Sequence, residues 1–218
     1  MDHAATLLES LPQAQRLALA YAPRETRGRF AGLLALDARL GGIVGSSREP
    51  MLAQLRLAWW REQLAAGSSE AARGEPLIAA LTCWGEDRKA MTALVDAWEG
   101  MTGEPPIAPT VFERLAEARA AIFGKIVKSP EPDSHVLRMA RNWALADIAF
   151  RLTDPAEQSA ALDLARQQDW SQARLPRNVR PLAMLHALAT RNLASGLPVN
   201  TLRPMTALAM IRIGLLTG

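Results

Sequence analysis

The sequence contains a single cysteine, Cys83, and only three histidines among its 218 residues. One cysteine excludes an internal disulfide and a thiolate zinc cluster, and it is typical of a reducing, cytoplasmic compartment. The histidines, His3, His135 and His186, lie far apart in the chain, so the helical histidine pair of a zinc hydrolase is missing. These absences argue against metal sites built from thiolates or paired histidines.

No apolar run is long enough to cross a bilayer. The most hydrophobic stretch, Met205 to Leu216, is interrupted by Arg212 and is shorter than the roughly 20 residues of a transmembrane helix. The first residues include Asp2 and Glu9 and lack the basic start and cleavage site of a secretion signal. We therefore expect a cytoplasmic protein, in which Met205 to Leu216 either covers the fold or lies on a membrane surface.

Lysine is scarce, with only Lys89, Lys125 and Lys128, so arginine supplies nearly all the cations behind the net charge of +3. The arginines are spread between acidic residues and form no basic stripe of the kind that follows a nucleic-acid backbone. No nucleic-acid partner is therefore expected. The mild positive charge suits an anionic small ligand or a membrane surface.

Runs of β-branched residues are missing, whereas leucine and alanine dominate and apolar residues recur three and four apart. This periodicity predicts helices nearly throughout and no strand. The Pro-rich breaks at 102–109 and 129–133 are too short for interdomain linkers, so residues 1–218 are expected to form a single-domain, all-α helical bundle. The expected helices span about residues 12–22, 24–44, 49–66, 76–84, 87–101, 111–128, 134–152, 155–168, 181–195 and 205–216.

Helix starts are indicated by proline and by capping residues. Pro50 and Pro155 stand where a first helical turn begins, a place where a missing backbone N–H does no harm. The segments Thr110 to Glu113 and Asp154 to Glu157 have the spacing of a capping box. Ser134 is expected to cap the helix that follows it.

The segment Arg48 to Leu64 (REPMLAQLRLAWWREQL) predicts a helix with a wide apolar surface, and we expect it to be a central helix. Arg56 is close enough to Trp60 for stacking, and Arg61 follows one turn after Leu57. Two interpretations remain open for this segment. Either its tryptophans line an apolar cavity, or it is an ordinary core helix whose arginines are solvated.

A second segment, Arg138 to Leu152, also carries apolar residues on several faces. Asp147 and Arg151 are four residues apart with the acid first, the better order for an ion pair within a helix. We expect this pair to stabilise the helix. The glycine-rich run 41–45 has no preceding strand and no following Gly-Lys-Ser/Thr, which excludes a P-loop and a Rossmann turn.

Several segments, in their order and spacing, resemble the squalene/phytoene synthase family of head-to-head prenyl synthases. The resemblance covers most of residues 15 to 165. The segments that carry it are Leu33 to Ser46 (LLALDARLGGIVGS), Trp60 to Leu64 (WREQL), Pro76 to Leu81 (PLIAAL), Leu94 to Met101 (LVDAWEGM) and Ala120 to Gly124 (AAIFG).

The resemblance implies an all-α bundle of the isoprenoid synthase type, whose members bind two prenyl diphosphates and hold Mg²⁺ with two aspartate-rich motifs. Hard divalent cations take oxygen ligands, and they neutralise the diphosphate as it leaves. Where the first family motif has three aspartates, this chain has Gly41, Gly42 and Gly45, and the only acid on that helix is Asp37.

The second aspartate-rich motif is also degenerate. The corresponding segment offers Asp147, Arg151 and Asp154 at spacings that do not reproduce the family pattern. We therefore expect a non-catalytic family member with no metal and no cofactor. The Arg48-Glu49-Pro50 start and the doubled tryptophan are similar to a divergent branch whose mitochondrial relative assists the assembly of respiratory complex I.

Three hypotheses follow from these observations. The first is a non-catalytic assembly factor or lipid-binding protein, cytoplasmic or peripheral at the inner membrane, with a respiratory-complex partner. Its cavity would take a prenyl, quinone or other lipid chain, with an anionic head group against Arg48, Arg56 or Arg61 beside Trp60. Asp147 and Arg151 are further candidate ligand-binding residues.

The second hypothesis is an active prenyltransferase that condenses two prenyl diphosphates with Mg²⁺. Its metal ligands would be relocated to Asp37 with Asp147 or Asp154. The third hypothesis is a helical protein-interaction module with a filled core and no ligand.

Overall fold

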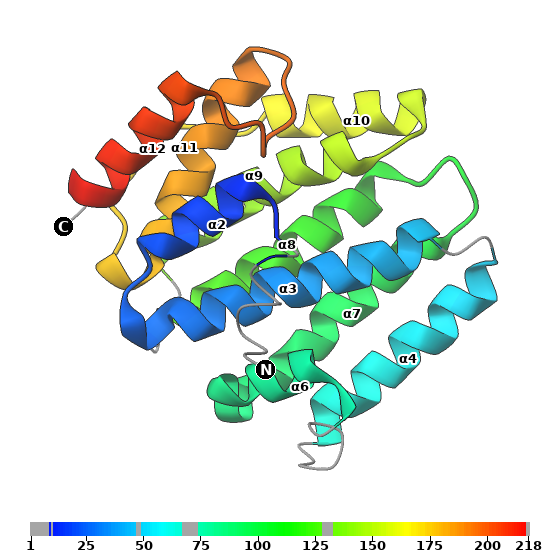
Figure 1. The fold of residues 1–218 in the computed structure, drawn as a ribbon. Coiled ribbons are helices and arrows are strands. Elements are labelled where there is room, and N and C mark those ends of the chain that lie inside the picture. Colours follow the sequence, from blue (N-terminus) through cyan, green and yellow to red (C-terminus); the bar gives the residue numbers. More distant parts are fainter. Residues whose placement is uncertain (1–8, 10, 47–48, 67–73, 128–132, 217–218) are drawn as a thin grey trace.

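The computed structural model describes residues 9, 11–46, 49–66, 74–127 and 133–216. Within these ranges the chain is mainly helical and has no strand, which confirms the expected all-α class. In chain order the α-helices are α2 (Gln13–Ala20), α3 (Arg24–Ser46), α4 (Pro50–Ala66), α6 (Pro76–Ala80), α7 (Thr92–Glu99), α8 (Pro109–Ile126), α9 (Ser134–Arg151), α10 (Pro155–Arg166), α11 (Arg180–Ala194) and α12 (Pro204–Leu216). Figure 1 shows them packed into one bundle.

The largest departure from the expected helices lies between residues 76 and 101. In place of helices at 76–84 and 87–101, the short helix α6 leads into a 3₁₀ segment, Leu81–Met91, before α7 begins. The segment is kinked at Gly85, whose φ of 55° lies in the left-handed region that glycine tolerates. The kink follows Trp84, whose side chain is buried, so the chain turns there without exposing the indole.

Two expected helix caps are wrong, one by one residue and the other by two. Asp133, not Ser134, caps α9, and its carboxylate accepts hydrogen bonds from the first free backbone N–H groups at 2.8 and 3.3 Å. The capping box expected from Thr110 is absent, because α8 begins at Pro109 and the preceding residue, Ala108, makes no side-chain cap. Both shifts are of the size by which helix ends ordinarily vary.

The expected box at the start of α10 is half confirmed. Asp154 caps the helix, accepting hydrogen bonds from the backbone N–H groups of Ala156 and Glu157 at 2.9 Å each. The carboxylate of Glu157 instead accepts a hydrogen bond from the backbone N–H of Ile107 at 2.8 Å. Glu157 of α10 therefore holds the loop that precedes α8.

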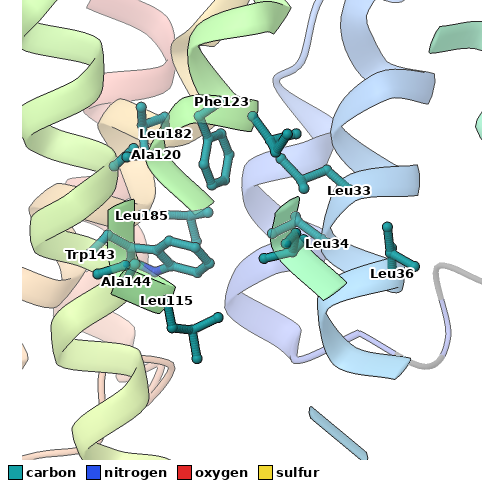
Figure 2. Close-up of a cluster of buried hydrophobic side chains, with 14 of the residues drawn as sticks. Leu33, Leu34, Leu36, Leu115, Ala120, Phe123, Trp143, Ala144, Leu182 and Leu185 are labelled. Carbon is teal, nitrogen blue, oxygen red and sulfur yellow. The ribbon is translucent and has the colours of Figure 1, made fainter. Parts of the chain in front are cut away.

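The core forms where four helices meet. Side chains from α3, α8, α9 and α11 converge in Figure 2, with Phe123 of α8 and Trp143 of α9 in edge-to-face contact at 5.7 Å between ring centroids. Helix α9 is buried on nearly all sides, and its many alanines allow neighbouring helices to approach closely. It is α9 that occupies the centre of the bundle.

Helix α4, expected to be central, instead lies at the edge of the bundle (Figure 1). One face of α4 packs against the rest of the chain through Ala53, Leu57, Trp60 and Leu64. The opposite face carries exposed apolar side chains, namely Met51, Leu52, Leu55 and Trp59. The expectation failed because this helix has two apolar faces, of which the described chain covers one.

None of the helices in the described ranges is both long and apolar enough to pass through a membrane. Helix α12 packs on α11 and α2, so the C-terminal apolar stretch covers part of the bundle. A side chain at Gly214 would collide with Tyr21, because a Cβ there would lie 2.8 Å from the ring. The outer side of α12 leaves Met205, Leu208 and Leu215 exposed.

Candidate functional site

A groove of about 620 Å³ lies between α3 and α4 and is open to solvent. One wall comes from α3, the other from α4, and the start of α6 contributes the remainder. Its lining residues are Ala35, Ala38, Arg39, Gly42, Ile43, Ser46, Arg56, Trp59, Trp60, Glu75 and Leu77.

The groove exists because α3 presents small residues where α4 presents large ones. Ala35, Ala38 and Gly42 recur three and four residues apart and therefore share one side of α3. No atom lies within 4 Å of the position that a Cβ of Gly42 would take, so the space beside it is open. Across the groove, Trp59 and Trp60 stand edge to face with their ring centroids 5.2 Å apart.

Two arginines give the groove its charge. Arg39 forms an ion pair with Glu75 at 3.1 Å. Its guanidinium also lies 5.9 Å from the ring centroid of Trp60, so Arg39 occupies the place beside this ring that was expected for Arg56. Arg56 is exposed and has no hydrogen bond or ion pair with any other described residue. The groove thus combines apolar walls with a guanidinium that no other described residue neutralises, a combination suited to an apolar chain with an anionic head group.

A second polar feature lies in the interior, where two acids from different helices share one arginine. Arg119 of α8 donates from Nε to Asp37 of α3 at 2.8 Å and from Nη1 to Asp147 of α9 at 3.1 Å. All three side chains are at most 5% exposed. Trp98 of α7 donates from Nε1 to the same oxygen of Asp37 at 2.9 Å. Four helices are therefore joined through one buried ion network.

Arg151 and Asn200 complete the network. Arg151 donates from Nε to Asp147 at 2.7 Å, which confirms the expected pair within α9, and its Nη2 lies 3.9 Å from Asp37. Asn200 donates to the other oxygen of Asp147 at 3.0 Å. Burial by itself would raise the pKa of Asp147, but the charges of Arg151 and Arg119 outweigh it and hold that pKa below its ordinary value. Asp147 is therefore ionised at neutral pH.

Gly41 lies directly over this network. A Cβ at this position would be 2.9 Å from Cη2 of Trp98 and 3.2 Å from Nη1 of Arg151, so only glycine fits without displacement. At Gly45, in contrast, a Cβ would meet no atom within 4 Å, and this residue does not line the groove. Gly41, Gly42 and Gly45 thus have different surroundings.

The buried acids do not fit a divalent cation site. Mg²⁺ is bound in proteins by carboxylate oxygens together with waters and substrate phosphates, whereas Arg119 lies between Asp37 and Asp147 and supplies the positive charge itself. Asp154, the remaining acid of the second segment, caps α10. Within the described ranges, no group of three or more His, Cys, Asp or Glu side chains is arranged to hold a metal.

The predicted ligand-binding residues fall into separate places. Arg56 and Trp60 reach the groove, whereas Asp147 and Arg151 belong to the ion network. Arg48 lies outside the described residues.

Arg61 lies on the side of α4 that faces α7. It donates to Asp96 at 2.6 Å and also bonds Glu99, so it ties α4 to α7 and does not line the groove. Its pKa is raised by the hydrogen bond that it donates to Asp96, against the opposing effect of burial.

Arg119 holds the network together, yet it was not among the residues predicted from the sequence. A signal for it was present, because Arg119 lies on the apolar face of α8 between Leu115 and Phe123. A charged side chain in such a stripe requires a buried partner of opposite charge. Asn200 gave no such signal, since it lies in a loop whose contact with α9 depends on the tertiary fold.

Comparison with models of protein families, with curated proteins and with solved structures gives no significant match to this chain. The resemblance to prenyl synthases therefore rests on the motifs quoted from the sequence.

Proposed function

We propose that the chain is a non-catalytic binding protein that holds an apolar chain with an anionic head group in the groove between α3 and α4. The observation that carries this proposal is the lining of the groove, with Trp59, Trp60 and Ile43 as apolar walls and with Arg56, which pairs with no other described residue. A volume of about 620 Å³ lies within the range of small-molecule sites. Prenyl phosphates are the first ligands to test, followed by quinones and fatty acids.

The ion network supports the non-catalytic part of the proposal. Ionisation of a prenyl diphosphate by Mg²⁺ needs carboxylates that are free to bind the metal. Asp37 and Asp147 are instead buried and paired with Arg119. An active prenyltransferase with relocated metal ligands would have to break these pairs first.

A role in the assembly of respiratory complex I, and a peripheral location at the inner membrane, are implied by the resemblance alone and stay predictions. An interaction module that binds no small ligand is the remaining alternative. It differs from the proposed function in one measurable property, the absence of saturable binding in the groove.

The test is titration of the purified protein with geranylgeranyl monophosphate in metal-free buffer, followed by tryptophan fluorescence, because Trp59 and Trp60 line the groove. Gly42→Leu fills the open space and should weaken binding at least about tenfold. Gly45→Leu is the matched control, since it adds the same side chain to the same helix outside the groove. Absence of saturable binding, or equal affinity of the two variants, would overturn the proposal.

A second pair of variants tests the head-group contact. Arg56→Ala should lower the affinity for geranylgeranyl monophosphate several-fold, since a hydrogen bond to a charged group is worth about 1.5 to 3 kcal/mol before solvent screening. The affinity for uncharged geranylgeraniol should stay unchanged. Arg212→Ala removes an exposed arginine of α12 and should affect neither ligand.

A further inference from the structure

The outward face of α4 is an apolar stripe that the described residues leave largely exposed, although Trp59 at its edge also packs on Trp60 and lines the groove. It consists of Met51, Leu52, Leu55 and Trp59, which are 70, 48, 62 and 41% exposed. These side chains leave on the order of 400 Å² of apolar surface in water, the size of the largest apolar patch on a typical monomer, and such a patch is often functional. The opposite face of the same helix packs against the bundle, and within the described part of the chain the stripe stays exposed.

The charges beside the stripe indicate what kind of surface covers it. Arg56 and Glu62 on α4 and Glu49 just before it are exposed and carry both signs. A surface that binds anionic lipids is instead rimmed by cations, because acids near the headgroups are repelled. A protein surface with the same balance of charges meets no such repulsion.

The spacing of the stripe is self-complementary. Met51 lies four residues before Leu55 and Trp59 lies four residues after it, so all three follow one line along the helix. If two α4 helices pack antiparallel about a two-fold axis at Leu55, Met51 of each protomer lies against the partner's Trp59. Methionine sulfur against an aromatic ring is a favourable contact.

We propose that a second copy of this chain covers the stripe, giving a two-fold symmetric dimer through antiparallel α4 helices. Two-fold dimers are the commonest oligomers, and the same patch serves both subunits. A stable homodimer buries about 800 Å² per subunit, of which roughly two thirds is apolar, and the stripe supplies most of that apolar share. The inference goes beyond the proposed function and does not depend on it.

Analytical ultracentrifugation of the ligand-free protein tests the dimer. The wild type should sediment at twice the 23.7 kDa mass of the chain. Leu55→Glu should raise the dimer dissociation constant at least about a hundredfold, because the change is present in both subunits. Leu208→Glu, on α12, is the matched control, since Leu208 is 61% exposed against 62% for Leu55, and it should remain dimeric.

Cysteine crosslinking tests the register in a Cys83→Ser background. Leu55→Cys should form a disulfide-linked dimer, and a mixture of Met51→Cys and Trp59→Cys proteins should give mixed dimers. Leu208→Cys should give no crosslink.

Three results would overturn the proposal. In the first, the wild type is monomeric at all concentrations. In the second, Leu55→Glu has native circular dichroism and still forms the dimer. In the third, the wild type is a monomer that binds neutral phosphatidylcholine vesicles, and Leu55→Glu no longer binds them. The last result would assign the stripe to a membrane. Binding in the groove is measured separately with geranylgeranyl monophosphate, so a failure of the dimer can be told apart from a failure of the proposed function.

Discussion

Arg119 and Asp37 form an ion pair inside the bundle, although they are 82 residues apart in the chain. Nε of Arg119 lies 2.8 Å from Oδ1 of Asp37, and the two side chains are 1 and 5% exposed. The same guanidinium also bonds Asp147. Because charges in the interior are costly when unpaired, each member of this network depends on the others.

Replacement of Arg119 by methionine should therefore strongly destabilise the fold. The change leaves Asp37 buried without its main counter-charge, and such losses cost about 3 to 5 kcal/mol in the free energy of unfolding. Urea denaturation followed by circular dichroism at pH 7 measures the effect.

Arg61→Met is the matched control for that experiment. Arg61 also bridges two acids, Asp96 and Glu99, but its side chain is 34% exposed. Exposed pairs contribute about 0 to 1 kcal/mol, so this variant should lose little stability. Similar losses for both arginines would show that burial does not govern the energy of the network.

The network also predicts the outcome of a catalytic assay. Purified protein supplied with geranylgeranyl diphosphate and Mg²⁺ should release no diphosphate above the buffer control, because Asp37 and Asp147 are paired with arginine. Asp37→Asn should behave in the same way. Release by the wild type that disappears in Asp37→Asn, but persists in the surface variant Asp96→Asn, would demonstrate a relocated metal site.

Local sequence patterns predicted the features that depend on neighbouring residues. Leucine and alanine periodicity located most helices, and the four-residue spacing of Asp147 and Arg151 predicted their ion pair, observed at 2.7 Å. Proline at a first helical turn placed the starts of α4 and α10 at Pro50 and Pro155. These features are determined within one or two turns of the chain, which is the range that such patterns describe.

The features that were missed depend on contacts between distant segments. The sharing of Asp37 by Arg119 and Trp98 joins three helices, and no spacing along the chain specifies it. The position of α4 at the edge was missed for a related reason. A helix with two apolar faces suggests a central place, whereas α9, which lies there, carries many alanines and a buried Asp147.

Because of His186, the free energy of unfolding should fall as the pH is lowered from 6.5 to about 4. Its side chain is fully buried against Trp170, and Nδ1 lies 3.1 Å from the amide nitrogen of Gln172. Burial, helped by the charge of Arg138 and opposed by that of Asp169, lowers the pKa of His186 from 6.5 to about 4. In this window the unfolded chain binds a proton that the folded protein does not, so acidification favours unfolding.

The decrease in the free energy of unfolding that is attributable to His186 is complete near pH 4 and amounts to about 3 kcal/mol at most. Urea denaturation at pH 7, 6, 5 and 4.5 measures it as a slope of unfolding free energy against pH. His186→Gln should flatten this slope, because glutamine does not titrate. His135→Gln, at an exposed position on α9, should leave it unchanged. A slope that survives in His186→Gln would assign the pH dependence to other groups.

Gly41 and Gly45 should respond to alanine with opposite signs. At Gly41 the new methyl group would meet Cη2 of Trp98 at 2.9 Å, and Trp98 is held by its hydrogen bond to Asp37, so it has little freedom to move. Overpacking of this kind costs about 1 to 3 kcal/mol. At Gly45 the methyl group meets nothing within 4 Å, so higher helix propensity should raise stability by up to about 1 kcal/mol.

Both glycines lie on α3, so their alanine variants gain similarly from helix propensity and differ mainly in what the methyl group touches. Urea denaturation at pH 7 should therefore place the wild type between a less stable Gly41→Ala and a more stable Gly45→Ala. If Gly41→Ala is as stable as Gly45→Ala, then Trp98 and Arg151 move aside easily. In that case the interior network is looser than its hydrogen bonds indicate, and Asp37 and Asp147 are freer to bind a metal than their pairing with Arg119 implies.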